Sequence, residues 1–277
     1  MSAVGQKEKT TQERVVQLFQ EQLGYEYLGN WKSRPANSNI EHEYLNAFLK
    51  KQGYSDTLIA KALYELEKVA KDQTKSLYDL NKETYKLLRY GVKVKPDAGE
   101  TNVTVRLVDW ANPENNHFAI AEEVTVEGTN TKRPDVVLYV NGLALGVLEL
   151  KRSTVTLSEG IRQNLDNQKE IFIKPFFSTV QYVMAGNDTE GLKYGTVETP
   201  EKYYLTWKED SEVENLLDRS LLQICEKVRF LELIHDFVIF DAGVKKLCRP
   251  NQYFGVKAAQ KRILAREGGI IWHTQGS

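Results

Sequence analysis

The chain has 277 residues, of which 41% are hydrophobic and 27% are charged, a balance that allows a packed core and excludes wholesale disorder. Its 37 basic and 38 acidic residues give a net charge of −1, so any DNA-binding site has to be a local basic patch on a neutral molecule. No apolar run approaches the roughly 18 residues of a membrane-spanning helix, and we expect a cytoplasmic protein that makes no contact with membranes.

The first part of the chain is predicted to be helical. Between Thr10 and Leu23, apolar residues recur at three- and four-residue steps, which is typical of an amphipathic helix. After a polar loop, further helices are expected to end near Lys51, to cover residues 56–80, and to end near Gly91. Together these segments predict a helical N-terminal lobe.

Short β-branched segments then replace the helical pattern. The strongest predicted strands cover residues 135–140 and 143–150, and Asn141-Gly142 between them is a strong hairpin signal. Both strands are apolar on both faces, which is typical of the centre of a sheet that is covered on each side. Thr156-x-x-Glu159 predicts a capping box at the start of the next helix. The expected fold class is α/β, with a mixed central sheet of about five strands flanked by helices.

Three charged residues lie at the end of these two strands. Glu149 and Lys151 are two residues apart, so their side chains share one face, and Asp135 begins the neighbouring strand. Burying two close carboxylates is costly unless a cation neutralises them, and Mg²⁺ is the natural partner of oxygen ligands. With Lys151 acting on a water or a phosphate, the group suits metal-assisted hydrolysis of a phosphodiester. A surface salt bridge is the simpler interpretation, but the apolar strands favour a buried site.

The hairpin register provides a test of this site. A plain two-residue turn would place Asp135 opposite Leu148, and Glu149 would then point to the other face of the sheet. Two carboxylates on opposite faces cannot share a metal ion, and an offset of one residue removes the problem. We therefore predict a β-bulge, a three-residue loop or an irregular start at Pro134-Asp135. The carboxyl groups should then lie within about 6 Å of each other.

Several motifs carry a family resemblance. Pro134-Asp135 followed by Glu149-Leu150-Lys151 resembles the PD-(D/E)xK nuclease superfamily. The sequences of residues 23–29, 37–41 and 249–254 resemble, more specifically, the restriction (motor) subunit of type I restriction–modification enzymes. Residues 268–277 resemble the beginning of that family's Walker A motif. The similarity runs along the whole chain in consistent order.

The resemblance implies a restriction-endonuclease-like domain over residues 1–240, including the helical lobe. Residues 241–277 would be a linker and the start of a truncated RecA-like ATPase (translocase) domain. The implied function is the endonuclease portion of an ATP-dependent type I restriction enzyme, which cleaves double-stranded DNA with Mg²⁺. The implied partners are DNA and the methylation and specificity subunits, which supply sequence recognition.

The resemblance also implies roles for single residues. Asp135 and Glu149 would bind Mg²⁺ and Lys151 would assist the attacking water. Gln163 would be the first residue of a Q-x-x-x-Y motif, although Asn167 stands here in place of the tyrosine. The family also tends to supply an acidic residue from an early helix.

For that acidic residue, Glu41 and Glu43 are the candidates, and either is equally explained as an ordinary first-turn carboxylate. Gln252 resembles the glutamine that reads adenine in related helicases. Because the Walker lysine is absent from this chain, ATP should bind only in the full-length subunit.

Two other functions remain open. The chain could be a stand-alone metal-dependent nuclease of the same superfamily, although the Walker-like ending disfavours this. It could also be a non-catalytic module that docks the motor to its partners, although the presence together of Asp135, Glu149 and Lys151 disfavours that.

Overall fold

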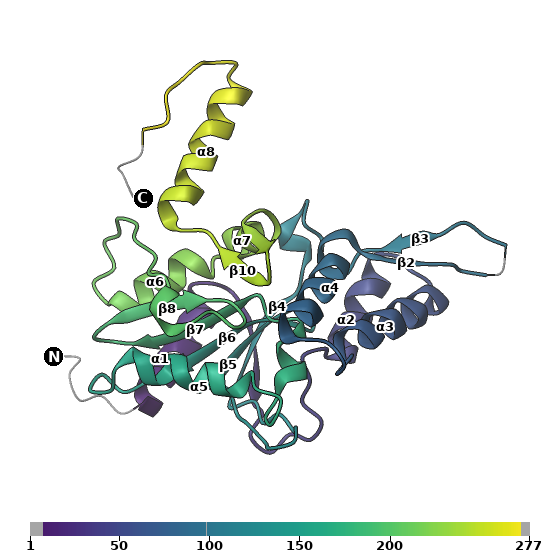
Figure 1. Ribbon diagram of the computed structural model, residues 1–277, viewed down its shortest axis with the longest axis horizontal. Helices are drawn as coiled ribbons and strands as arrows, with labels where there is room; N and C mark the ends of the chain where they lie inside the picture. Colours follow the sequence, from purple (N-terminus) through teal and green to yellow (C-terminus); the bar gives the residue numbers. More distant parts are fainter. Residues whose placement is uncertain (1–7, 98, 273–277) are drawn as a thin grey trace.

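The computed structural model describes residues 8–97 and 99–272 and is built around one mixed sheet (Figure 1). The strands, in spatial order, are β1 (Glu26–Asn30), β4 (Phe118–Glu122), β5 (Val136–Val140), β6 (Leu143–Leu150), β7 (Tyr182–Asn187) and β8 (Gly191–Gly195). β1 is parallel to β4 and β6 is parallel to β7, whereas the other neighbours are antiparallel. The predicted α/β class with a mixed sheet is confirmed, with six strands instead of about five.

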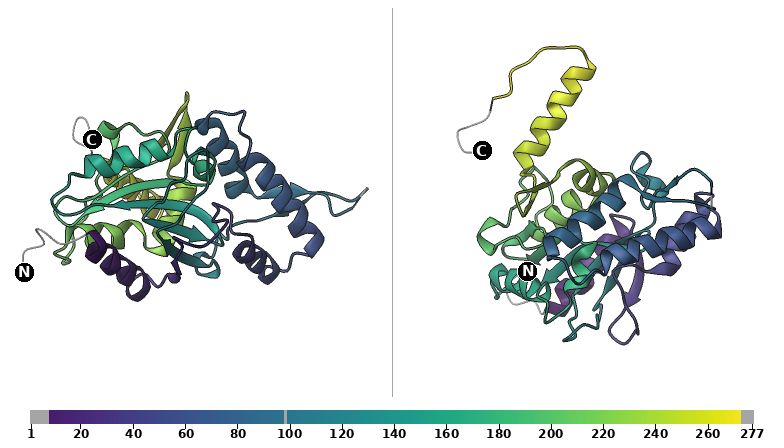
Figure 2. Two further views of the ribbon diagram at one scale, coloured as in Figure 1. Left: turned by 90° about the horizontal axis from the view of Figure 1, so that it is seen from below. Right: turned by 45° about the vertical axis from the view of Figure 1, so that its right-hand side comes forward.

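Both faces of the sheet are covered. Every residue of β5, β6 and β7 is buried, as expected for central strands whose sequence is apolar throughout. Helices α1 (Glu8–Glu21), α6 (Leu216–Ile224) and α7 (Lys227–Asp236) pack into the core on one face. Helix α5 (Leu157–Asn167) packs on the other, and the left view of Figure 2 shows α1 and α5 on opposite sides of the sheet.

A helical lobe stands beside one end of the sheet (Figure 1). It consists of α2 (His42–Lys51), α3 (Asp56–Ala70), α4 (Leu77–Tyr90) and the hairpin of β2 (Val92–Val94) with β3 (Val103–Val105). The lobe was predicted, but the single helix over residues 56–80 is wrong. The Ser76 side chain accepts a hydrogen bond from the Asp79 N–H at 3.1 Å and begins a second helix there.

Helix α5 begins at Leu157 without the predicted capping box. The Thr156 side chain makes no capping hydrogen bond. Glu190, from the turn between β7 and β8, instead accepts a hydrogen bond from the Leu157 N–H at 3.0 Å. A carboxylate at a helix N-terminus is favoured by the helix dipole, so a distant residue stabilises the start of α5.

The C-terminal part contains a second hairpin, β9 (Val238–Asp241) with β10 (Val244–Leu247), followed by α8 (Pro250–Leu264). The expected domain boundary after residue 240 therefore falls inside this hairpin. Helix α8 extends away from the rest of the molecule (Figure 1). Short 3₁₀ helices cover Pro113–Asn115, Lys174–Ser178 and Glu201–Tyr203. Among the described residues, no helix is long and apolar enough to cross a membrane.

Candidate active site

The pairing of β5 with β6 shifts by one residue part-way along the hairpin. Tyr139 pairs with Ala144, whereas Leu138 pairs with Gly146. Leu145 is therefore an extra residue on β6, which is a β-bulge. The prediction of a register offset in this hairpin is confirmed.

The bulge brings the two acidic residues to the same face of the sheet. Beyond it, Val136 lies opposite Leu148, so the residue before Val136 lies opposite the residue after Leu148. These residues are Asp135 and Glu149. Asp135 Oδ2 accepts a hydrogen bond from the Leu150 N–H at 2.7 Å, which fixes the aspartate at the end of β6.

Burial and proximity govern the charge of this pair. Burial raises the pKa of Asp135 to about 6, although the Leu150 N–H and the Lys151 ammonium act in the opposite direction. Burial and the neighbouring Asp135 raise the pKa of Glu149 well above its usual range. Glu149 Oε2 is buried and makes no hydrogen bond to a described residue. Without a cation, the pair therefore favours holding a proton.

Lys151 lies beside the pair and is held by two acceptors. Its Nζ donates to Glu149 Oε1 at 3.0 Å and to Gln163 Oε1 at 2.9 Å. Burial acts to lower the pKa of Lys151, but the Glu149 and Asp135 carboxylates outweigh it and the net pKa is raised. Lys151 is therefore a fixed positive charge and a hydrogen-bond donor. The structure brings together Asp135, Glu149, Lys151 and Gln163.

Gly160 allows α5 to approach Lys151 closely. A Cβ atom at Gly160 would lie 3.2 Å from Ala185 Cβ and 3.4 Å from Lys151 Cγ. The lysine stem therefore passes beneath the helix at its smallest residue, one turn before Gln163. Sequence reasoning missed Gly160, although a glycine inside a helical pattern is a recognisable sign of close packing.

The site fits a hard divalent cation in part. Two facing carboxylates, one with a buried oxygen that no described residue hydrogen-bonds, are the donors that Mg²⁺ takes. In the part of the chain that the structure describes, no group of three or more His, Cys, Asp or Glu residues could hold a metal ion. The protein would thus supply two carboxylates, and water or phosphate oxygens would complete the coordination.

Comparison with known proteins identifies the family. Residues 5–203 match the family model described as the N terminus of the type I restriction enzyme R protein. The chain belongs to this family. The HindI endonuclease subunit of Haemophilus influenzae, a type I restriction enzyme, is 30% identical over 251 residues, which cover 76% of this chain and 23% of that protein.

An archaeal relative matches the chain to a similar extent. The putative type I restriction enzyme MjaVIIIP endonuclease subunit of Methanocaldococcus jannaschii is 28% identical over 247 residues, covering 81% of this chain and 23% of the relative. The chain spans less than a quarter of the length of these two relatives.

Glu41 is not brought to the acidic pair in this R protein N-terminal domain. Its backbone N–H donates to the Gly142 carbonyl at 2.7 Å, so Glu41 lies at the turn end of the hairpin, about 20 Å along β6 from Glu149. Its carboxylate makes two hydrogen bonds with Arg34, at 2.6 and 3.1 Å. Glu43 is exposed on α2.

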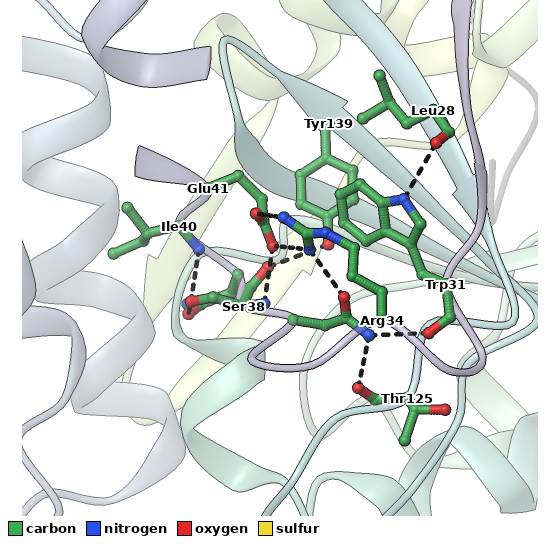
Figure 3. A network of polar contacts seen from close by, with 10 residues as sticks. Leu28, Trp31, Arg34, Ser38, Ile40, Glu41, Thr125 and Tyr139 are labelled. Carbon is green, nitrogen blue, oxygen red and sulfur yellow. Dashed lines mark hydrogen bonds and ion pairs between the residues drawn. The ribbon is translucent and has the colours of Figure 1, made fainter. Parts of the chain in front are cut away.

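Arg34 and Glu41 belong to a network that fixes the loop before α2 (Figure 3). The Arg34 guanidinium lies 3.9 Å from the centre of the Trp31 ring, and the Tyr139 hydroxyl donates to the Ser38 carbonyl at 3.0 Å. The motif over residues 37–41 therefore has a structural explanation at the far end of the sheet from the acidic pair.

A different acidic residue from an early helix reaches the site. Glu8, the first residue of α1, places its carboxylate 4.0 Å from Lys151 Nζ and 3.9 Å from Arg152 Nε. The charge of Glu8 also contributes to the raised pKa of Asp135. The sequence offered no sign of this contact because it joins residues more than a hundred positions apart.

The remaining motif residues lie away from this site. Asn167, at the position of the motif tyrosine, is buried and makes no side-chain hydrogen bond to a described residue. Gln252 Oε1 accepts a hydrogen bond from the Arg249 N–H at 2.9 Å in the first turn of α8. Of the Walker-like segment, residues 273–277 lie outside the described residues.

Proposed function

We propose that this chain is the endonuclease region of a type I restriction enzyme R subunit and that it hydrolyses double-stranded DNA with Mg²⁺. The observation that carries this proposal is the bulge in β6. It places Asp135 and Glu149 on one face beside Lys151, and it does so in a chain that belongs to the R protein family.

In this function each residue has a distinct task. Asp135 and Glu149 would hold Mg²⁺, which supplies an activated water and charge stabilisation at the phosphate. The Lys151 ammonium would donate to a phosphate oxygen or to the attacking water. Gln163 would keep Lys151 in place through its 2.9 Å hydrogen bond.

The larger assembly is also part of the proposal. Residues 1–240 would form the nuclease domain. Residues 241–277 would form a linker and the start of a RecA-like motor domain. ATP, with Gln252 reading adenine, would bind only in the full-length subunit. The methylation and specificity subunits would supply sequence recognition. The names of the relatives, as endonuclease subunits of type I restriction enzymes, support this assignment.

The test is Glu149→Ala in the full-length R subunit assembled with its partner subunits. We expect DNA cleavage to fall on the order of a thousandfold or more, because the metal loses one of two carboxylates. ATP-driven translocation should continue at the parental rate. Glu159→Ala, an exposed position on α5, is the matched control and should cleave like the parent.

Parental cleavage by Glu149→Ala would show that the assignment is wrong and would favour a docking module without chemistry. Loss of both cleavage and translocation would indicate a structural defect instead. In that case Glu149→Gln, which keeps the shape of the side chain, decides between the two explanations.

A further inference from the structure

Arg152 follows the site lysine and is paired with the same carboxylate as Lys151. The Arg152 side chain is 66% exposed, whereas that of Lys151 is 10% exposed. One oxygen of Glu8 faces Lys151 and the other faces Arg152, at 4.0 and 3.9 Å. These distances exceed those of hydrogen bonds. Glu8 therefore neutralises the two cations loosely, and both keep donor capacity for another anion.

The position of Glu8 follows from the way α1 is fixed to the sheet. Thr11 Oγ1 donates to Asp188 Oδ2 at 2.9 Å, and Gln12 Nε2 donates to Glu122 Oε2 at 3.0 Å. Arg14 forms ion pairs with Asp188 and with Asp218. Residues three and four positions after Glu8 share its helix face, so these contacts hold the first turn of α1 against the site.

The proposed hydrolysis of DNA requires a phosphate anion beside Lys151. A phosphate is negatively charged, as the Glu8 carboxylate is, and it has more acceptor oxygens. It forms short hydrogen bonds with guanidinium and ammonium groups. We propose that Glu8 occupies the place of a DNA phosphate on Lys151 and Arg152 in the free protein, and that Arg152 is a phosphate-binding residue which DNA releases from Glu8. This inference rests on the proposed function, because it takes DNA as the ligand.

The proposal has two consequences for DNA binding. Removing the charge of Glu8 should strengthen binding, because the phosphate no longer has to displace a carboxylate. Removing Arg152 should weaken binding and should reduce the dependence of affinity on salt by the share of one phosphate contact. The two effects should also be coupled, since Glu8 acts partly through Arg152.

The experiment measures binding of a short fluorescent DNA duplex to the 277-residue chain by anisotropy, in EDTA and over a range of NaCl concentrations. Glu8→Gln should bind about twofold to fivefold more tightly than the parent. Arg152→Gln should bind more weakly, with a slope of log K against log salt that is smaller by about one. In the Arg152→Gln background, Glu8→Gln should have a smaller effect than in the parent.

Two exposed positions serve as controls. Glu13→Gln removes an acidic charge from the same helix, and Lys68→Gln removes a cation from α3. Both should change affinity much less than the corresponding site variants. Circular dichroism and thermal melting of every variant confirm that the fold is retained.

An unchanged or weaker affinity of Glu8→Gln overturns the proposal, as does failure of both parent and variant to bind the duplex at low salt. Loss of Mn²⁺-dependent stabilisation in Glu8→Gln also overturns it, because Glu8 would then be a metal ligand. The binding assay contains no metal and no cleavage. Parental cleavage by Glu149→Ala would therefore refute the nuclease assignment without changing these affinities.

Discussion

At the scale of single residues, the acidic pair is the energetically least favourable feature of the site. Asp135 and Glu149 lie close together in a buried setting, and burial raises the pKa of each. Placing such groups together reduces the stability of the metal-free fold whenever they are ionised. This arrangement makes the fold itself sensitive to pH and to cations.

The sensitivity to pH has a definite sign. The pKa of Asp135 rises from its ordinary 3.8 to about 6 in the folded chain. The protonated Asp135 carboxyl therefore contributes stability below about pH 4, and this contribution is lost as the pH rises through about 6. In EDTA, the parent should lose up to roughly 3 kcal/mol of unfolding free energy relative to Asp135→Asn between about pH 4 and pH 7. Urea unfolding of both proteins over this range provides the measurement.

Two comparisons make this prediction specific. Glu159→Gln, at an exposed position on α5, is the control for removing a carboxylate outside the buried pair. Near pH 8, millimolar Mn²⁺ should stabilise the parent and have much less effect on Asp135→Asn, since a ligand of the native state raises stability. A difference between parent and Asp135→Asn that stays constant with pH would contradict the account of the buried pair.

The residues of the site were predictable to different degrees. Asp135, Glu149 and Lys151 stand at the ends of strongly apolar strands, so local pattern was sufficient to group them. Gln163 came from family resemblance alone. Glu8 could not be predicted, because its place depends on how α1 crosses the sheet, and Glu41 was an equally reasonable candidate by sequence.

At the scale of elements, the distance between α5 and β6 decides where Lys151 lies. Gly160 permits the close approach, since a Cβ atom there would meet Ala185 and Lys151 at 3.2 and 3.4 Å. These contacts are tight but not prohibitive. A small enlargement of the helix should therefore move the lysine stem before it disrupts the fold.

We expect Gly160→Ala to change the unfolding free energy by less than about 1 kcal/mol, because the gain in helix propensity offsets the tighter contact. Cleavage by the assembled full-length enzyme should fall about tenfold or more, as Lys151 is displaced from the acidic pair. Urea unfolding and a cleavage assay measure the two effects. Glu159→Ala, the preceding residue, is the control, and parental cleavage by Gly160→Ala would show that the contact is unimportant.

The elements themselves were predicted unevenly, for physical reasons. β6 was predicted over its observed residues because an apolar run covered on both faces needs no information about its neighbours. β1 and β8 were missed, since short strands at the sheet edges depend on pairing with β4 and β7. The hairpin of β9 with β10 was not predicted, because its sequence lacks the regular alternation of a strand.

At the scale of the whole molecule, one buried lysine joins three parts of the fold. Lys245, on β10, donates from Nζ to Asn81 Oδ1 at 2.8 Å and to Gln181 Oε1 at 2.6 Å. Asn81 lies on α4, and Gln181 directly precedes β7. The C-terminal hairpin, which crosses the expected domain boundary, is thereby anchored to α4 and to the central sheet.

Burial lowers the pKa of Lys245 well below its ordinary 10.5. The unfolded chain then binds a proton that the folded chain releases more easily, so stability rises with pH between the folded and the ordinary value. Relative to Lys245→Met, the parent should gain up to about 1.4 kcal/mol of unfolding free energy per pH unit in this window. Urea unfolding between about pH 7 and pH 9.5 tests this.

The neighbouring residue provides the comparison for this variant. Lys246 is about half exposed and pairs with Asp241, so Lys246→Met removes a lysine from the same hairpin without removing a buried side chain and serves as the control. A difference between the parent and Lys245→Met that stays constant with pH would mean that Lys245 keeps its proton in the fold. Groups common to both proteins cancel in each comparison.

Because of the bulge at Leu145, the site depends on whether the number of residues between the Asn141-Gly142 turn and Glu149 is odd or even. Deleting one residue between the turn and Glu149 would leave every motif letter in place and every strand apolar, yet it would turn Glu149 away from Asp135. Chains that share the motif but differ here by a single residue should therefore differ in metal binding. A graft of this hairpin onto another sheet has to carry the extra residue as well as the acidic ones.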